Sequence, residues 1–245
     1  KAGQAVTELE QLKPKFDHYH QLNTKLESAI TTAQSFATEI SGQQELSDLN
    51  VFFDLRLTDG SFLANSMNAV DNTLYFLDQE KRQVVQLSRD TKQFNSITLS
   101  GTQAINDWAA APKNLYLLGD GINSYTLADA KSNQLKETGD SDRDGTILRQ
   151  FDAYLYVFNP IKRNIFRFTF NTTGLSQGIG WITDKKNLDF NQIRDMIVDG
   201  SVWLTTKDGQ ILKYVQGQSQ TFTIDGLAEP FNSPLQISTA ENDDN

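Results

Sequence analysis

An acidic stretch near the middle of the chain has the spacing of a calcium-binding loop. It runs Asp140-Ser-Asp142-Arg-Asp144-Gly145-Thr146. Carboxylates at alternate positions of a tight loop converge on one hard cation such as Ca²⁺. The full helix-loop-helix calcium pattern fails, because Phe151 stands where a bidentate Glu is needed. We therefore expect either a solvated acidic turn or a weak Ca²⁺ site with the ligands Asp140, Asp142, Asp144, Thr146 and Asp152.

Few other residues could do metal or acid–base chemistry. The chain has no Cys, and its 2 His are His18 and His20. Residues two apart on a helix point to different faces, unlike the i, i+4 pair of a helical zinc site. Residues 48–245 contain neither Cys nor His, which excludes a Ser-His-Asp triad or a His-ligated metal there. We expect no enzymatic activity and no cofactor other than Ca²⁺.

The charge balance limits the partners. The 245 residues include 22 Lys and Arg and 31 Asp and Glu, for a net charge of −9. Because phosphates repel an acidic chain whose basic residues are not gathered on one face, we expect neither nucleic acid nor anionic lipid as a partner. No apolar run approaches the roughly 20 residues that cross a bilayer. Since the chain starts at Lys1, we expect a processed product or an excised piece.

Residues 1–47 are expected to form an α-helical stem with a coiled-coil period. Apolar residues recur at intervals of three and four, at Leu9, Leu12, Phe16, Tyr19, Leu26, Ile30, Ala33, Ala37 and Ile40. The stable helix is expected to begin at Pro14, which lacks a backbone donor, and to end at Ser41-Gly42, with residues 1–13 frayed or in a separate turn. It packs on its own protein or another helix, or it self-associates through residues 9–41. Small side chains such as Ala33 suit an antiparallel hairpin as well as a parallel dimer.

After residue 48 the apolar pattern changes to the alternation typical of β-strands. Four similar segments, 74–78, 115–119, 155–159 and 202–206, start 41, 40 and 47 residues apart, each after a polar turn. A second strand follows each, beginning at Val84, Ile122, Ile165 and Ile211. We expect outer strands at 94–99, 135–138 and 221–224, and inner strands at 105–109 and 193–197.

This repeat predicts a mainly β fold, a β-propeller in residues 48–245 built from four-stranded antiparallel blades. A single such sheet cannot bury both faces, so neighbours stack around a ring. A β-sandwich would not explain the recurrence of one four-strand unit. Four to five blades are visible. Residues 234–238 resemble the inner strand of a further blade, and 51–55 with 62–64 could supply an outer strand that closes the ring. We expect one or more blades beyond Asn245, so that the propeller is truncated at its C-terminus.

Inner strands of a propeller line its central channel, so their polar residues are candidates for ligand binding. These residues are Asn68, Asp107, Arg149, Arg194 and Asp195. Their mixed charges could equally form ion pairs that satisfy one another. As a further alternative, Asp107 and Asp195 could be the paired carboxylates of a glycoside hydrolase.

The alternation Leu74-Tyr-Phe-Leu-Asp78, polar turn, Val84-Val-Gln-Leu87 resembles NHL-type and WD-like bacterial propellers. The Ala-rich helical stretch, Phe-Phe-Asp-Leu-Arg-Leu at 52–57 and the Leu-Tyr strands are similar to a narrower group. That group comprises membrane proteins of uncultivated small-genome bacteria, in which a PPM-type phosphatase-like domain precedes a membrane helix, a helical stem and a propeller. The resemblance implies that this chain is their extracytoplasmic part, tethered to the membrane in the full-length protein. This sequence has neither the phosphatase motifs nor the membrane span.

The sequence thus favours a non-enzymatic binding module on a helical stem, which presents its loops to a protein, peptide or cell-envelope ligand. Two alternatives stay open. One is a carboxylate-dependent enzyme such as a glycoside hydrolase, and the other is a scaffold that oligomerises through its stem.

Overall fold

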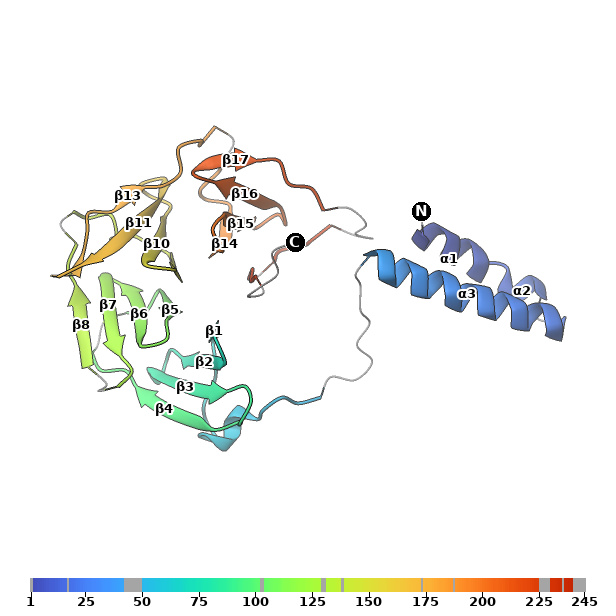
Figure 1. Cartoon of the computed structure of the whole chain (residues 1–245), viewed down its shortest axis with the longest axis horizontal. Helices are drawn as coiled ribbons and strands as arrows, with labels where there is room; N and C mark the ends of the chain where they lie inside the picture. Colours follow the sequence, from blue (N-terminus) through green and yellow to red (C-terminus); the bar gives the residue numbers. More distant parts are fainter. Residues whose placement is uncertain are drawn as a thin grey trace. The chain divides into compact units, whose positions relative to one another are not determined.

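The structure, a computed structural model, describes residues 2–16, 18–41, 50–101, 104–128, 131–137, 139–172, 174–186, 188–224, 230–234 and 236–239. The chain divides into two compact units, Lys1–Phe52 and Phe53–Asn245. The first unit is helical and the second is built from β-strands (Figure 1). None of the described helices is long and apolar enough to cross a bilayer.

The N-terminal unit is a helical hairpin, which we call the stem. It comprises α1 (Ala2–Glu10), α2 (Lys13–Phe16) and α3 (His20–Ser41). Helix α1 packs against α3, and Gln34 Nε2 donates to Glu10 Oε1 at 3.1 Å. Leu26 and Ile30 of the expected apolar seam are buried in this hairpin.

The expected start of the stable helix at Pro14 is wrong. Residues 2–10 form a helix of their own, because their apolar side chains, among them half-buried Leu9, cover the seam of α3. The predicted end of the long helix is close, since α3 ends at Ser41.

The second unit contains four antiparallel sheets, numbered here as blades 1 to 4. Blade 1 has the strands β1 (Ser66–Val70), β2 (Thr73–Asp78), β3 (Gln83–Ser88) and β4 (Phe94–Thr98). Blade 2 has β5 (Asp107–Ala110), β6 (Asn114–Gly119), β7 (Gly121–Thr126) and β8 (Lys131–Leu135). Blade 3 has β9 (Ile147–Phe151), β10 (Tyr154–Asn159) and β11 (Asn164–Asn171), with β12 (Gly174–Leu175) and β13 (Ile179–Gly180) at its edge. Blade 4 has β14 (Ile193–Val198), β15 (Val202–Thr206), β16 (Ile211–Val215) and β17 (Gln218–Gln220).

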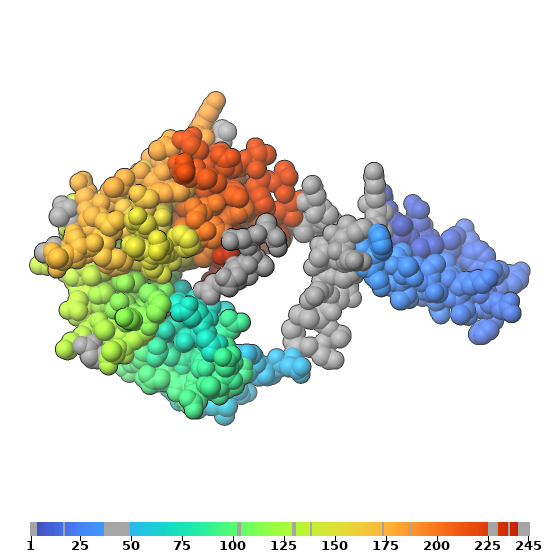
Figure 2. Space-filling model, in the orientation of Figure 1, coloured from blue at the N-terminus to red at the C-terminus, as the bar shows by residue number. Residues whose placement is uncertain are grey.

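The predicted propeller of four-stranded blades is confirmed. The four similar segments found in the sequence are the second strands β2, β6, β10 and β15. The first strand of each blade lies toward the centre and the last toward the rim (Figure 1). The blades pack side by side in chain order, as the space-filling view shows by colour (Figure 2).

Three hydrophobic clusters hold the four blades together, one at each junction. Trp108 belongs to the cluster between blades 1 and 2, and Phe168 to the cluster between blades 2 and 3. Met196 and Phe158 belong to the cluster between blades 3 and 4. Each blade therefore depends on its neighbour to shield its apolar face, as the sequence argument required.

Two outer strands differ from the prediction. The strand expected at 135–138 is Lys131–Leu135, and the strand expected at 221–224 is Gln218–Gln220. Both observed strands consist mainly of exposed polar residues, so they lack the apolar alternation that marks the other strands. The tight turn at Gln216 and Gly217, with φ of 50° and 81°, sets the start of β17 instead.

The segments that flank the blades also differ from the prediction. Residues 51–55 form no strand, and a single 3₁₀ turn (η1, Leu55–Leu57) begins at the last of them. Asp54 caps this turn, since its carboxylate accepts the Arg56 N–H at 3.0 Å. Residues 62–64 form no strand either; they lie beside blade 1, where the Leu63 N–H donates to Asp78 Oδ2 at 2.9 Å. The described residues of 234–238 form no strand, and no strand of the described part of the chain pairs with them.

Candidate functional site in the inner strands

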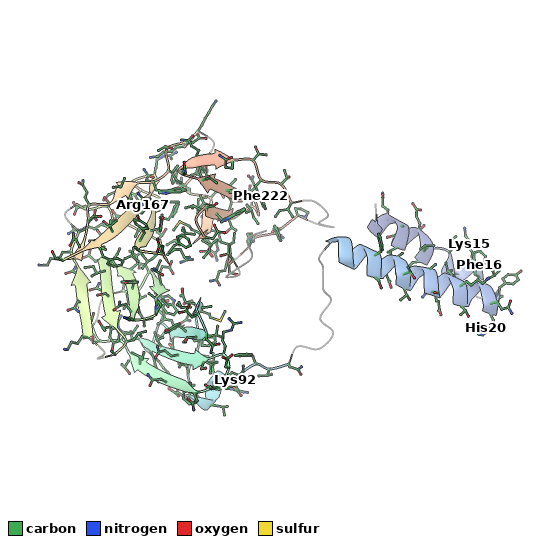
Figure 3. All side chains as sticks on the ribbon, in the orientation of Figure 1. Lys15, Phe16, His20, Lys92, Arg167 and Phe222 are labelled. Atoms are coloured by element: carbon green, nitrogen blue, oxygen red, sulfur yellow. The ribbon has the colours of Figure 1, made fainter. Side chains whose placement is uncertain are left out.

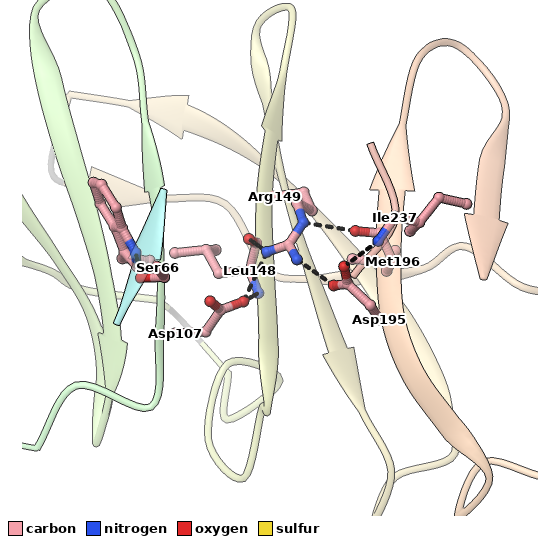
Figure 4. Close-up of polar contacts among 8 residues, drawn as sticks. Ser66, Asp107, Leu148, Arg149, Asp195, Met196 and Ile237 are labelled. Carbon is pink, nitrogen blue, oxygen red and sulfur yellow. Dashed lines mark hydrogen bonds and ion pairs between the residues drawn. The ribbon is translucent and has the colours of Figure 1, made fainter. Parts of the chain in front are cut away.

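The first strands of blades 2, 3 and 4 bring three charged side chains together. Arg149 of β9 lies between Asp107 of β5 and Asp195 of β14 (Figure 4). Its Nη1 is 2.8 Å from Asp107 Oδ2, and its Nη2 pairs with Asp195 Oδ1. The side chains of Arg149 and Asp195 are only 14% and 7% exposed, so this is a largely desolvated ion-pair network. We call these three residues the inner-strand cluster.

Two further donors of Arg149 bind backbone carbonyls. Its Nε donates to Met196 O at 2.6 Å and its Nη1 to Leu148 O at 2.6 Å. A guanidinium has five N–H donors in a rigid planar fork, which suits it to bridge several acceptors at once. Arg149 therefore ties the inner strand of blade 3 to those of blades 2 and 4.

The two carboxylates occupy equivalent places in the repeat. Asp107 lies opposite Leu118 and Asp195 opposite Thr205, and each of these partners is the fourth residue of its Leu-Tyr-like segment. Each carboxylate also accepts a backbone N–H from the segment that follows its blade. The Leu148 N–H donates to Asp107 Oδ2 at 2.7 Å, and the Ile237 N–H donates to Asp195 Oδ2 at 2.8 Å.

Burial and the ion pair act on Asp107 in opposite directions. Desolvation raises the pKa of the Asp107 carboxyl above its ordinary value, while the Arg149 guanidinium and the Leu148 N–H oppose the rise. Chemically, the cluster joins blades through charge-assisted hydrogen bonds. Neither carboxylate is left without a cation and an N–H donor.

The other two predicted channel residues do not join the cluster. Asn68 is half-buried on β1 opposite Tyr75. Arg194 is exposed at an irregularity of the β14–β15 pairing. The structure thus brings together three of the five residues that the sequence placed in the channel.

The residues of the acidic loop do not converge. Asp140 is exposed and pairs with Arg143 at 3.5 Å, and Asp144 and Asp152 are exposed with φ of 62° and 52°. Asp142 is buried and lies beside Glu137. Thr146 is exposed, and its N–H donates to Phe158 O. Within the described part of the chain, no group of three His or acidic side chains is placed to hold a metal ion.

Glu137, which the sequence analysis did not identify, connects the acidic loop to blade 3. Glu137 Oε2 accepts the Asp142 N–H at 3.0 Å, and Oε1 accepts the Gly178 N–H of blade 3 at 2.8 Å. Burial and the neighbouring Glu137 carboxyl raise the pKa of Asp142 to about 6. No sequence signal identifies this pair, because Glu137 lies outside the alternating acidic motif.

Ser66 was also missed, although the repeat contains the signal. It lies opposite Leu77 on β1, which is the same place in blade 1 that Asp107 and Asp195 occupy in blades 2 and 4. Ser66 Oγ accepts the Trp108 Nε1–H of the next blade at 2.6 Å. Aligning the inner strands by their partners would have found it.

The fold and this cluster define the class of protein as a β-propeller domain whose inner strands are linked by polar contacts from one blade to the next. No protein-family model and no curated protein matches the chain. Among solved structures, it resembles a structural genomics protein of unknown function from Bacteroides thetaiotaomicron, with a TM-score of 0.55 and 16% identity over 72% of this chain and 54% of that one. A chain of a nidogen/laminin complex matches with a TM-score of 0.50 and 12% identity, over 70% of this chain and 65% of that one. The match therefore spans between half and two thirds of these solved chains, and it shows the fold alone.

Proposed function

We propose that this chain is a non-enzymatic propeller module that binds a protein, peptide or cell-envelope ligand. The supporting observation is that Arg149 and backbone N–H groups bind both Asp107 and Asp195. A carboxylate-dependent glycoside hydrolase needs one acid that holds a proton and a second that attacks the sugar or activates water. Carboxylates that join neighbouring blades are poorly suited to either role.

A binding screen paired with a turnover assay tests this proposal. The whole chain is applied to arrays of peptides and of peptidoglycan fragments, and the same fragments are incubated with it and analysed for cleavage. We expect saturable binding of at least one ligand and no cleavage. Hydrolysis that the variant Asp195→Asn abolishes would instead support the carboxylate enzyme.

The module is proposed to be the extracytoplasmic sensory part of a bacterial membrane protein. Support comes from the resemblance of residues 52–57 and the Leu-Tyr strands to the stem-plus-propeller proteins named above. Protease treatment of intact cells that produce the full-length protein tests the location. We expect cleavage in intact cells, whereas protection until lysis would contradict an external location.

Self-association through the stem is a second candidate function. In the described part of the stem only Leu26 and Ile30 are buried, and Tyr19, Leu22 and Phe36 are 62%, 48% and 61% exposed. A groove of about 540 Å³ runs beside α3, lined by Ala29, Ala33 and Phe36 among others. Sedimentation of the whole chain tests this candidate. A concentration-dependent dimer that Phe36→Glu dissolves would support it, and a monomer at all concentrations would exclude it.

A further inference from the structure

The rims of blades 2 and 3 are joined by contacts that follow strand β8. The Leu175 N–H of β12 donates to Lys136 O at 3.0 Å, and the Gly178 N–H donates to Glu137 Oε1 at 2.8 Å. Both donors lie at the edge of blade 3, whereas both acceptors continue the outer strand of blade 2. We call residues 136–137, 139–142 and 174–178 the rim clasp.

The two segments of the clasp beside blade 3 lie in close contact. A Cβ atom on Gly178 would lie 2.7 Å from the Ser141 Cβ and 2.6 Å from the Phe168 ring, so a side chain there would clash. Strand β13, which follows directly, pairs with β11, where Ile179 lies opposite Arg167, labelled in Figure 3. This side of the clasp is therefore fixed to blade 3.

The loop that precedes β9 is fixed to blade 3 as well. Asn159 Nδ2 donates to Arg143 O at 2.5 Å, and Lys162 Nζ donates to Asp140 O. Both acceptors are backbone carbonyls, which do not titrate. The contact that can change with pH is therefore the one that Glu137 makes from the end of blade 2.

The Glu137 carboxylate meets a second carboxyl group. Its Oε2 accepts the Asp142 N–H at 3.0 Å, and the Asp142 side chain lies beside it. Asp142 is 5% exposed, and its Oδ2 would be 3.2 Å from a Cβ atom on Gly121 of blade 2. The Ile122 N–H also donates to the Asp142 carboxyl. Two neighbouring carboxyl groups of which one is buried cannot both ionise without repulsion.

Within the described residues, no cation pairs with either carboxyl group. Arg143 pairs with Asp140 instead, at 3.5 Å, and Lys162 binds a backbone carbonyl. The charged residues on the segments around the pair are Asp120, Lys136, Asp140, Arg143, Asp144, Lys162 and Arg163. Burial and the Glu137 carboxyl therefore raise the pKa of Asp142 to about 6, so this group holds a proton in mildly acidic solution and releases it near neutral pH.

We propose that the rim clasp is a proton-dependent device, which holds blades 2 and 3 together at their rims while Asp142 is protonated. In that state Asp142 can donate to the Glu137 carboxylate, which stays bound to the Asp142 and Gly178 N–H groups. When Asp142 ionises, the two carboxylates repel each other. Glu137 then exchanges both N–H groups for water, and the contact between the rims loosens. The clasp would act whichever ligand the propeller binds.

Amide hydrogen exchange of the whole chain tests this device. NMR follows the protection factors of Asp142 and Gly178, whose N–H groups both bind Glu137. We expect both factors to fall about tenfold from about pH 5 to 7, because the closed clasp retains a proton that the open clasp releases. The Thr146 N–H of the same loop donates to Phe158 O at 2.9 Å and should keep its protection factor.

Two variants separate the effect of charge from that of structure. Glu137→Gln and Asp142→Asn each remove one carboxylate and keep an acceptor oxygen, so the protection of Gly178 should no longer depend on pH in either variant. Asp144→Asn changes an exposed acid of the same loop and should retain the dependence of about tenfold.

Three results would each overturn the proposal. One is a protection factor of Gly178 that stays constant with pH in the parent chain. Another is an equal fall at Thr146, which would mean that the whole propeller opens instead of the clasp. The third is a pH dependence at Gly178 that persists in Asp142→Asn. None of these results bears on the ligand screen of the proposed function.

Discussion

Arg149 and Asp195 form an ion pair across the junction of blades 3 and 4, and little of either side chain is exposed to water. The same guanidinium reaches Asp107 of blade 2, so one side chain connects three blades. A network of this kind is costly to break at one member, because the remaining charges stay buried without a partner.

Replacing Arg149 is expected to destabilise the propeller strongly. Arg149→Ala leaves the Asp195 carboxylate buried beside no cation, and losses of about 3–5 kcal/mol in the free energy of unfolding are typical of this change. Urea denaturation measures it. Arg56→Ala, which breaks the exposed pair with Asp54, is the control and should leave the midpoint unchanged. A similar small effect for both variants would mean that the network contributes little.

The Glu137–Asp142 pair should make stability depend on pH. The pKa of Asp142 is raised from 3.8 to about 6 in the folded chain, so the folded state holds a proton that the unfolded state releases between these values. The stabilising contribution is therefore complete below about pH 4 and is lost as the pH rises through about 6.

The variant Asp142→Asn isolates this contribution. It stays neutral at every pH and can still accept the N–H of Ile122, so its free energy of unfolding should exceed that of the parent chain increasingly from about pH 4 to 6. Chemical denaturation across this range measures the difference. The exposed neighbour Asp144→Asn is the control. A constant difference between the parent and Asp142→Asn would contradict a raised pKa of Asp142 in the folded chain.

Ca²⁺ is expected to have no effect on the folded chain at about 1 mM, the weak end of protein calcium affinities. Asp142 is buried whereas Asp140 and Asp144 are exposed, and among the described residues no group of three acidic side chains is placed to hold a metal ion, so too few oxygens meet at one point. Thermal unfolding with calcium chloride and with magnesium chloride measures the effect. A rise in Tm specific to Ca²⁺ would restore the loop as a metal site.

Trp108 should matter more for stability than Trp203, although both are on strands. Trp108 is 2% exposed and donates to Ser66 of the neighbouring blade, so Trp108→Ala should cost about 3–5 kcal/mol. Trp203 is half-buried and packs edge-on against Phe222, and Trp203→Ala should cost clearly less. Denaturation of both variants gives the comparison, and equal losses would contradict the larger contribution of the more buried tryptophan.

Much of the fold could be predicted from the amino-acid order because blade formation is local. The hairpins around β2, β6, β10 and β15 join strands that are close in sequence, and their buried faces produce a period of two. The rim strands β8 and β17 were misplaced because exposed polar residues carry no such period. Leu26 and Ile30 of the expected stem seam are buried in the hairpin, but a heptad pattern does not distinguish packing against α1 from packing against another chain.

The sequence predicted which residues form the inner-strand cluster, but not which of them pair with one another. Asp107, Arg149 and Asp195 were predicted to face the centre because each lies on a first strand of the repeat. Their pairing spans 42 and 46 residues and depends on how the blades are rotated about the common axis, which no local pattern encodes. The same holds for Glu137, which meets Gly178 of another blade, and for Ile237, which meets Asp195 across 42 residues of sequence. The apolar period of a strand and the residue types of a turn are properties of neighbouring residues, so they can be recognised in the sequence. Contacts between sheets arise only when those sheets pack.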